Sequence, residues 1–235
     1  MEVIGVMCRC SSLPGTLYVT NNRHALEKWM EVDNFLKRNR FFVNNESLNT
    51  ELDFFKYFMD GLPEWQLTCS IPLFRARRGI YLSKEQLTAP PESIIRDGRL
   101  NPAGVRYLYL SDSKITASYE VRPCNGSWVT TVELQVKDSK PLRIADFCRV
   151  KPEKKPNDYR YIINQQFSLP INEGKTEDYR ITQCIAEFIR LKGYDGARYD
   201  SSVHKGGRNI VIFDPEKMDF KDFEQTREVA VLQKS

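Results

Sequence analysis

The spacing of apolar residues changes near residue 70, and this change is what most limits the fold of the 235-residue chain. Before it, apolar side chains recur at helical intervals in the segment 22–30, and an aromatic-rich run with helical character covers 48–59. After it, short segments alternate apolar and polar residues, most clearly in 128–136. We therefore expect a helical extension in residues 1–65 and a β-rich domain in residues 66–235.

Further strands are expected in the β-rich part at 71–77, 106–110, 142–147, 197–199 and 209–213. Ser113 is predicted to cap a short helix over 114–119, with Glu120 at its end. A longer helix should run from about 176 to 191 and end at Gly193, which can adopt the left-handed conformation. Few helices among several short strands predict an α+β fold rather than a doubly wound parallel sheet.

Composition and charge exclude several functional classes. The net charge of +4 arises from 35 basic and 31 acidic residues, a near balance that does not predict a nucleic-acid surface. No apolar run has bilayer length and the first residues do not form a secretory signal, so we expect a cytoplasmic protein without a membrane partner. Its six cysteines are then expected to be reduced thiols. With only His24 and His204 present, neither a zinc site nor a histidine-based triad is expected.

Individual polar residues allow two interpretations each. Arg75 and Arg77 are two positions apart on an expected strand, so they share a face. A buried guanidinium needs an anion, which is either an internal carboxylate or a phosphate of a ligand. Tyr109 fits a core position or a stacking surface, and Glu120 alone would be an ordinary exposed carboxylate at a helix end.

Taken together, these fragments resemble the RES domain, a family named for an Arg, a Glu and a Ser and related to ADP-ribosyltransferase-like toxins. The resemblance covers residues 75–213, and Glu120 follows Tyr109 at the spacing typical of the family. The chain departs from the family pattern at Leu100, where Trp is usual, and at Asp200, where Pro is frequent. The matching fragments are Phe74-Arg75, Gly98-Arg99-Leu100-Asn101-Pro102, Tyr109-Leu110, Gly193-Tyr194-Asp195-Gly196, Ser201-Ser202, Asn209 and Asp214-Pro215.

The resemblance implies a mixed or antiparallel split sheet with flanking helices, and cleavage of NAD between nicotinamide and ribose. Nicotinamide is cationic in NAD and leaves without a general acid, whereas the ribose cation that develops requires a carboxylate nearby. No metal and no cofactor beyond NAD as substrate is implied. The residues implied as catalytic are Arg75, Glu120 and Ser201, and those implied to bind NAD are Arg75, Arg99, Tyr109, Ser202 and Asn209.

The acceptor of the ADP-ribosyl group stays open at this point. Phosphate would define an NAD phosphorylase, water an NAD glycohydrolase, and a protein side chain an ADP-ribosyltransferase. The resemblance further implies a bacterial growth-inhibiting toxin that an antitoxin neutralises. A catalytically silent module that binds a nucleotide or a protein is the alternative. The sequence leaves the oligomeric state open, a homo-oligomer included.

Overall fold

A computed structural model describes residues 23–38, 62–90, 92–148, 159–169 and 179–227 of the chain. These residues form one eight-stranded sheet with helices against it, in the strand order β1-β5-β6-β7-β3-β2-β4-β8. Only β5 and β6 pair in parallel, so the sheet is mixed and the expected α+β class is confirmed. The strands are β1 (Glu64–Leu67), β2 (Leu73–Arg78), β3 (Leu108–Ser111), β4 (Trp128–Val136), β5 (Leu142–Asp146), β6 (Gly196–Asp200), β7 (Arg208–Ile212) and β8 (Met218–Arg227).

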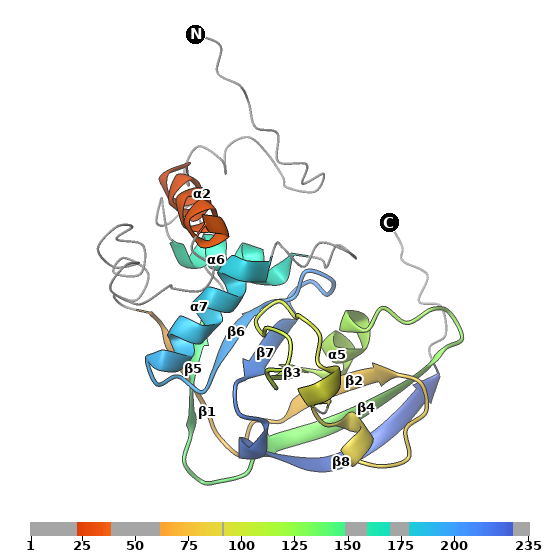
Figure 1. The fold of residues 1–235 in the computed structure, drawn as a ribbon. Helices are drawn as coiled ribbons and strands as arrows, with labels where there is room; N and C mark the ends of the chain where they lie inside the picture. Colours follow the sequence, from red (N-terminus) through yellow and green to blue (C-terminus); the bar gives the residue numbers. More distant parts are fainter. Residues whose placement is uncertain (1–22, 39–61, 91, 149–158, 170–178, 228–235) are drawn as a thin grey trace.

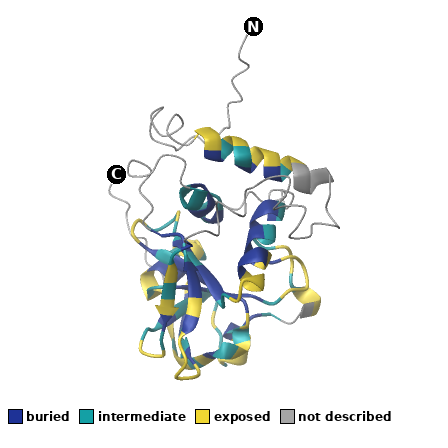
Figure 2. Ribbon diagram, turned by 90° about the vertical axis from the view of Figure 1, so that its left-hand side faces the viewer, coloured by how far each residue is buried: buried dark blue, intermediate teal, exposed yellow. Residues whose placement is uncertain are grey.

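Two apolar cores lie on opposite faces of the sheet because successive strand residues point to opposite sides. In β7, Val211 belongs to the core beneath the helices, whereas Ile210 and Ile212 belong to the other core. Figure 1 shows α2, α6 and α7 gathered over the β5–β6–β7 part of the sheet, and Figure 2 shows their buried sides turned toward it. The helices are α2 (Arg23–Arg38), α5 (Lys114–Glu120), α6 (Tyr159–Ser168) and α7 (Arg180–Leu191). The described residues also contain the short 3₁₀ turns η1 (Glu85–Leu87), η2 (Glu92–Ile94) and η4 (Pro215–Lys217).

The N-terminal helix shares its core with the β-rich part. In α2, Ala25, Trp29 and Val32 are buried in the same cluster as residues of α6, α7 and the sheet, whereas Met30 of the expected apolar face is 51% exposed. The strand β1 begins at Glu64, within the segment expected to be helical extension, and pairs with β5. The expected helical segment at 48–59 lies outside the described residues, and so does residue 22, where the first expected helical pattern begins.

The sheet opens between β2 and β3, and this opening positions the site. These two strands are paired only at Phe74 and Ser111, whereas β2 pairs with β4 along its whole length. The short helix α5 contacts both strands beside the opening. Its start is fixed by Ser113, whose side chain accepts a hydrogen bond from the Thr116 N–H at 3.1 Å, so the predicted cap is confirmed. The sheet is therefore split where Glu120, the last residue of α5, meets β2 and β3.

Candidate active site

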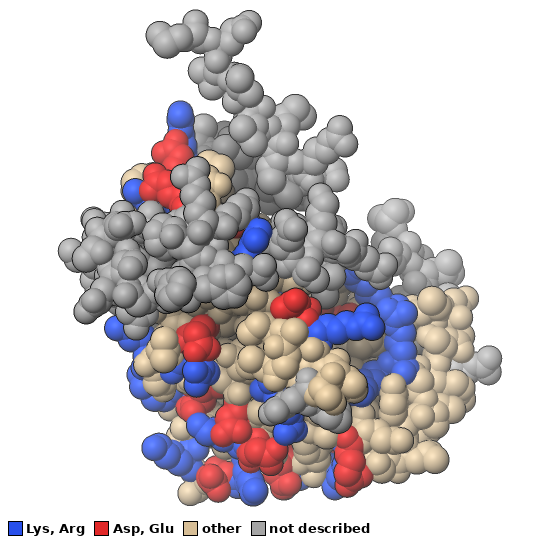
Figure 3. Space-filling view, viewed as in Figure 1, with Lys and Arg blue, Asp and Glu red and all other residues tan. Residues whose placement is uncertain are grey.

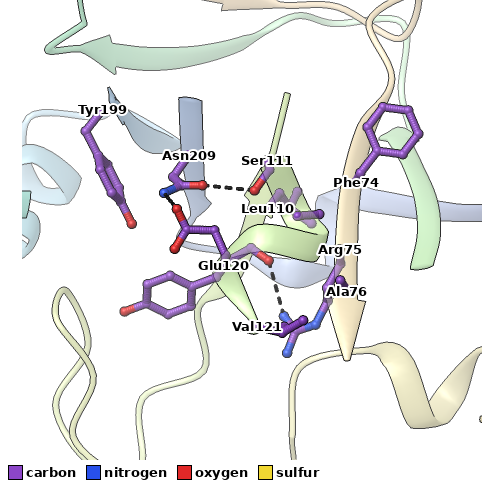
Figure 4. A pocket seen from close by; sticks show the side chains of 11 residues that line it. Phe74, Arg75, Ala76, Leu110, Ser111, Glu120, Val121, Tyr199 and Asn209 are labelled. Carbon is purple, nitrogen blue, oxygen red and sulfur yellow. Dashed lines mark hydrogen bonds between the residues drawn. The ribbon is translucent and has the colours of Figure 1, made fainter. Parts of the chain in front are cut away.

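A pocket of about 170 Å³ occupies the opening between β2, β3 and α5. An engineered apolar cavity of about 150 Å³ holds one benzene molecule, so this pocket has room for a single aromatic ring. Figure 4 shows Arg75 and Glu120 on two sides of it, and Figure 3 shows Lys and Arg side chains gathered on the face of the molecule where α5 and β2 lie. Its lining residues are Phe74, Arg75, Ala76, Tyr109, Leu110, Ser111, Ala117, Glu120, Val121, Tyr199 and Asn209.

Arg75 is a half-buried cation with a buried Nε, and it has no counter-ion among the described residues. Among the described residues no carboxylate forms a salt bridge with it, its Nε has no hydrogen-bond partner, and Nη1 makes one long bond of 3.5 Å to the Tyr109 carbonyl. Burial, and after it repulsion from Arg77, lowers the pKa of Arg75 to about 10. An internal ion pair, one of the two interpretations of the sequence, is absent from this part of the chain. The guanidinium is therefore free to bind an anion that enters the pocket.

Glu120 is held through one carboxylate oxygen. Its Oε1 accepts hydrogen bonds from Ser201 Oγ and from Asn209 Nδ2, both at 2.6 Å. The Asn209 amide is oriented in turn by Ser111, whose hydroxyl donates to Asn209 Oδ1 at 2.9 Å. Within the described residues, Oε2 has no hydrogen-bond partner and can receive a donor from a ligand.

The Ser201 hydroxyl is fully engaged. It donates to Glu120 Oε1, and its oxygen accepts from the backbone N–H groups of Val203 and His204 at 3.2 and 3.1 Å. A hydroxyl has one proton and two lone pairs, so Ser201 has no capacity left for a ligand. The His204 ring contacts Thr116 rather than Ser201, so no Ser–His dyad forms. In this geometry the Ser201 hydroxyl orients the Glu120 carboxylate.

Two residues expected to bind the ligand do not line the pocket. Arg99 donates from Nη1 to the Gln166 carbonyl at 2.6 Å, and its guanidinium lies over the Tyr179 ring at 5.6 Å. These contacts direct the side chain toward the helices α6 and α7. Ser202 is exposed in the loop after β6. Conversely, Ser111 and Tyr199 line the pocket although the sequence had not placed them in the site. Ser111 follows Tyr109 by two residues on the same strand, so the two side chains share a face. This spacing could have indicated Ser111 from the sequence.

Tyr109 is fixed by the loop that contains Arg99. Its hydroxyl donates to Asn101 Oδ1 at 2.7 Å and accepts from the Leu100 N–H at 3.1 Å. Burial raises the pKa of Tyr109, and that of Tyr199 across the pocket, so both phenols are neutral at physiological pH. An added Cβ at Gly98 would collide with Asn101 Oδ1, which explains why glycine begins this loop. The ring of Tyr109 is thus presented to the pocket while its hydroxyl is used by the protein.

We expect Tyr109→Phe to lower the free energy of unfolding by about 1–3 kcal/mol, because the Leu100 N–H and the Asn101 side chain lose a buried partner. Urea denaturation measures the change. Tyr194→Phe is the matched control, since the hydroxyl of Tyr194 has no hydrogen-bond partner in the described part of the chain. Equal stability of the two variants would contradict the assigned network.

Cys148 and Cys184 are not candidates for a nucleophile. Cys69, Cys124, Cys148 and Cys184 are free thiols. Burial raises the pKa of Cys184 to about 12 and raises that of Cys148 as well, and a protonated thiol is a poor nucleophile. Among the described residues, no cluster of His, Cys, Asp and Glu has the geometry to hold a metal ion, and no helix is long and apolar enough to cross a membrane.

Arg75, Glu120 and Ser201 come together where the α+β sheet is split. This arrangement is that of an Arg-Glu-Ser site. Comparison with family models agrees, since the RES domain model matches residues 72–231. The chain belongs to the RES domain family, as its motifs had predicted. No curated protein matches the chain. Among solved structures, it is similar to a chain in the crystal structure of the M. tuberculosis MbcT–MbcA toxin–antitoxin complex, with 15% identity and a TM-score of 0.42 over 70% of this chain and 86% of that chain.

Proposed function

We propose that this protein cleaves the bond between nicotinamide and ribose in NAD, with phosphate or water as the acceptor. The observation that carries the proposal is the pairing, across one pocket, of an unneutralised, half-buried guanidinium with a carboxylate that keeps one oxygen free. The first attracts an anion such as a pyrophosphate, and the second stabilises a cation. NAD carries both groups, one on each side of its nicotinamide ribose.

The pocket suits the departing end of NAD. Its volume of about 170 Å³ accommodates one ring, and Tyr109 and Tyr199 supply aromatic walls for nicotinamide. The rest of the dinucleotide must then extend out of the pocket, past the guanidinium of Arg75. Asn209 takes part by holding Glu120, because its amide nitrogen is already committed to that carboxylate.

The reaction follows from these positions. The C1′–N bond breaks with its electron pair passing to nicotinamide, which leaves as a neutral molecule, so no general acid is needed. Glu120 Oε2 accepts a hydrogen bond from a ribose hydroxyl and stabilises the positive charge that develops at C1′. An oxygen of phosphate or water then bonds to C1′, and a proton of water, where water is the acceptor, passes to the solvent. A toxin role, with an antitoxin that covers the site, is part of the proposal and rests on membership of the family.

The test is the release of nicotinamide from NAD by the purified protein, with the products identified by mass spectrometry with and without added phosphate. We expect ADP-ribose 1″-phosphate when phosphate is the acceptor and ADP-ribose when water is. Modification of an added protein would indicate an ADP-ribosyltransferase instead. Binding of NAD without any release would assign the chain to the silent nucleotide-binding modules, and neither binding nor release would overturn the proposal.

A further inference from the structure

The helix that carries Glu120 is attached to the β6–β7 loop by a second group of side chains. Thr116, Tyr119 and Glu120 lie three and four residues apart, so they share one face of α5. His204 of the loop contacts two of them. Its Nδ1 lies 2.9 Å from Thr116 Oγ1, and its ring stacks on Tyr119 with centroids 5.1 Å apart at 10°. The loop therefore contacts α5 along the turn that precedes Glu120.

Asp112, directly after β3, extends the contact between α5 and the loop. The Thr116 hydroxyl donates to Asp112 Oδ1 at 3.2 Å, and an ionised carboxylate only accepts. The Thr116 oxygen also lies 2.8 Å from Ser113 Oγ, at the start of α5, and 2.9 Å from His204 Nδ1 in the loop. Asp112 Oδ1 also accepts from the Arg208 N–H at 3.2 Å, which joins the far end of the loop to the same carboxylate.

His204 also fixes the serine that orients Glu120. Its backbone N–H donates to Ser201 Oγ at 3.1 Å while its ring is bound to α5. Close contact between loop and helix depends on Gly207, because an added Cβ there would lie 2.5 Å from Thr116 Oγ1 and 2.7 Å from His204 Nδ1. The main chain of His204 thus holds Ser201, and its side chain holds the helix that presents the carboxylate to Ser201.

We propose that Thr116 and His204 are positioning residues for Glu120, joining α5 to the β6–β7 loop so that Ser201 meets Oε1 and leaves Oε2 directed at the pocket. The expected kinetic effect rests on the proposed function, whereas the contacts themselves rest on the structure alone. Neither residue lines the pocket, so both act through Glu120 and not on the ligand. Loss of the contact should therefore change turnover and leave the affinity for NAD in place.

The kinetic test compares Thr116→Val, which keeps the shape and removes the hydroxyl, with Thr116→Ser, which keeps the hydroxyl. We expect kcat for nicotinamide release to fall about tenfold in the valine variant, the equivalent of one hydrogen bond in a charged network, with KM within about twofold of wild type. The serine variant should retain most of the activity, and Thr68→Val, in the segment between β1 and β2, should have no effect. A raised KM at constant kcat would overturn the inference.

A double-mutant cycle with Ser201→Ala separates positioning from general support of the fold. If Thr116 acts through the serine, Thr116→Val should lower kcat by less than about twofold once Ser201 is alanine. Independent, multiplicative losses would show that Thr116 only stabilises the fold. Gly207→Ala is expected to reproduce the valine phenotype, because it displaces the same two side chains.

A readout independent of turnover covers the case in which wild type releases no nicotinamide and the proposed function itself fails. The N–H groups of Val203 and His204 are protected by Ser201 Oγ. Thr116→Val should accelerate hydrogen exchange in the peptide covering 201–207, and Thr116→Ser should not. Unchanged exchange in the valine variant would overturn the positioning role whatever the reaction is.

Discussion

Glu120→Gln should lose turnover and keep both the fold and the affinity for NAD. The substitution removes the charge without changing the shape, and the remaining amide oxygen can still accept from Ser201 and Asn209. A carboxylate that stabilises a developing cation acts mainly in the transition state, so its loss lowers kcat. Removal of one preorganised electrostatic contact of this kind costs about 10²- to 10³-fold. Initial rates of nicotinamide release, with KM measured in parallel, give the result.

Glu216→Gln is the matched control, because the carboxylate of Glu216 has a side chain 78% exposed and does not line the pocket. The control should turn over NAD at the wild-type rate. A Glu120→Gln variant with wild-type kcat would remove the carboxylate from the mechanism. A variant with unchanged kcat and a raised KM would show that Glu120 binds NAD without stabilising the cation.

The strands inside the sheet were predictable because buried strands carry apolar residues at regular positions in their sequence. The segment 128–136 was identified with the bounds that β4 shows, and β2, β3, β5, β6 and β7 overlap their expected ranges. The missed strand β8 carries charged residues along its length because it lies at the edge of the sheet, where water reaches it. The other edge strand, β1, has only Leu67 fully buried among its four residues, so no alternation of apolar and polar residues marks it.

The helix α6 was missed for a different reason. It buries Asn164, a polar residue that interrupts the apolar stripe. The asparagine is satisfied by Asp200, whose N–H donates to Asn164 Oδ1 at 2.8 Å and whose carboxylate accepts from Nδ2 at 2.9 Å. Such a pair exists only after the chain has folded, so no local pattern could show it.

The same limit applies to the site. Short motifs brought Arg75, Glu120 and Asn209 to attention, and the fold places all three at one pocket. The position of the Arg99 side chain is set by its hydrogen bond to the Gln166 carbonyl of α6. The sequence of the loop around Arg99 does not show this tertiary contact. The sequence therefore brought several residues of the pocket to attention, but it did not show what each side chain contacts.

Arg75→Met should weaken NAD binding and leave the protein at least as stable as wild type. A half-buried cation without an internal carboxylate contributes no ion pair to the fold, and an apolar side chain of similar length removes its desolvation cost. The loss of a charged hydrogen bond to a pyrophosphate is worth about 1.5–3 kcal/mol, or about 10- to 100-fold in Kd. Calorimetric titration of NAD and thermal unfolding measure the two quantities on the same sample. Since the pKa of Arg75 is about 10, its contribution to affinity should not vary with pH below about 9.

Arg77→Met separates this effect from the loss of any arginine on the same strand. Arg77 donates from Nη2 to the Thr88 carbonyl at 2.9 Å and lies 6.0 Å from the Tyr81 ring, so it anchors the segment after β2 and does not line the pocket. We expect this variant to unfold at a lower temperature and to bind NAD as wild type does. The opposite pattern, with Arg75→Met unstable and its NAD affinity unchanged, would mean that the guanidinium supports the fold. Because the two arginines are two residues apart and differ in their partners, the pair of variants tests whether an anion-binding site lies at the split of the sheet.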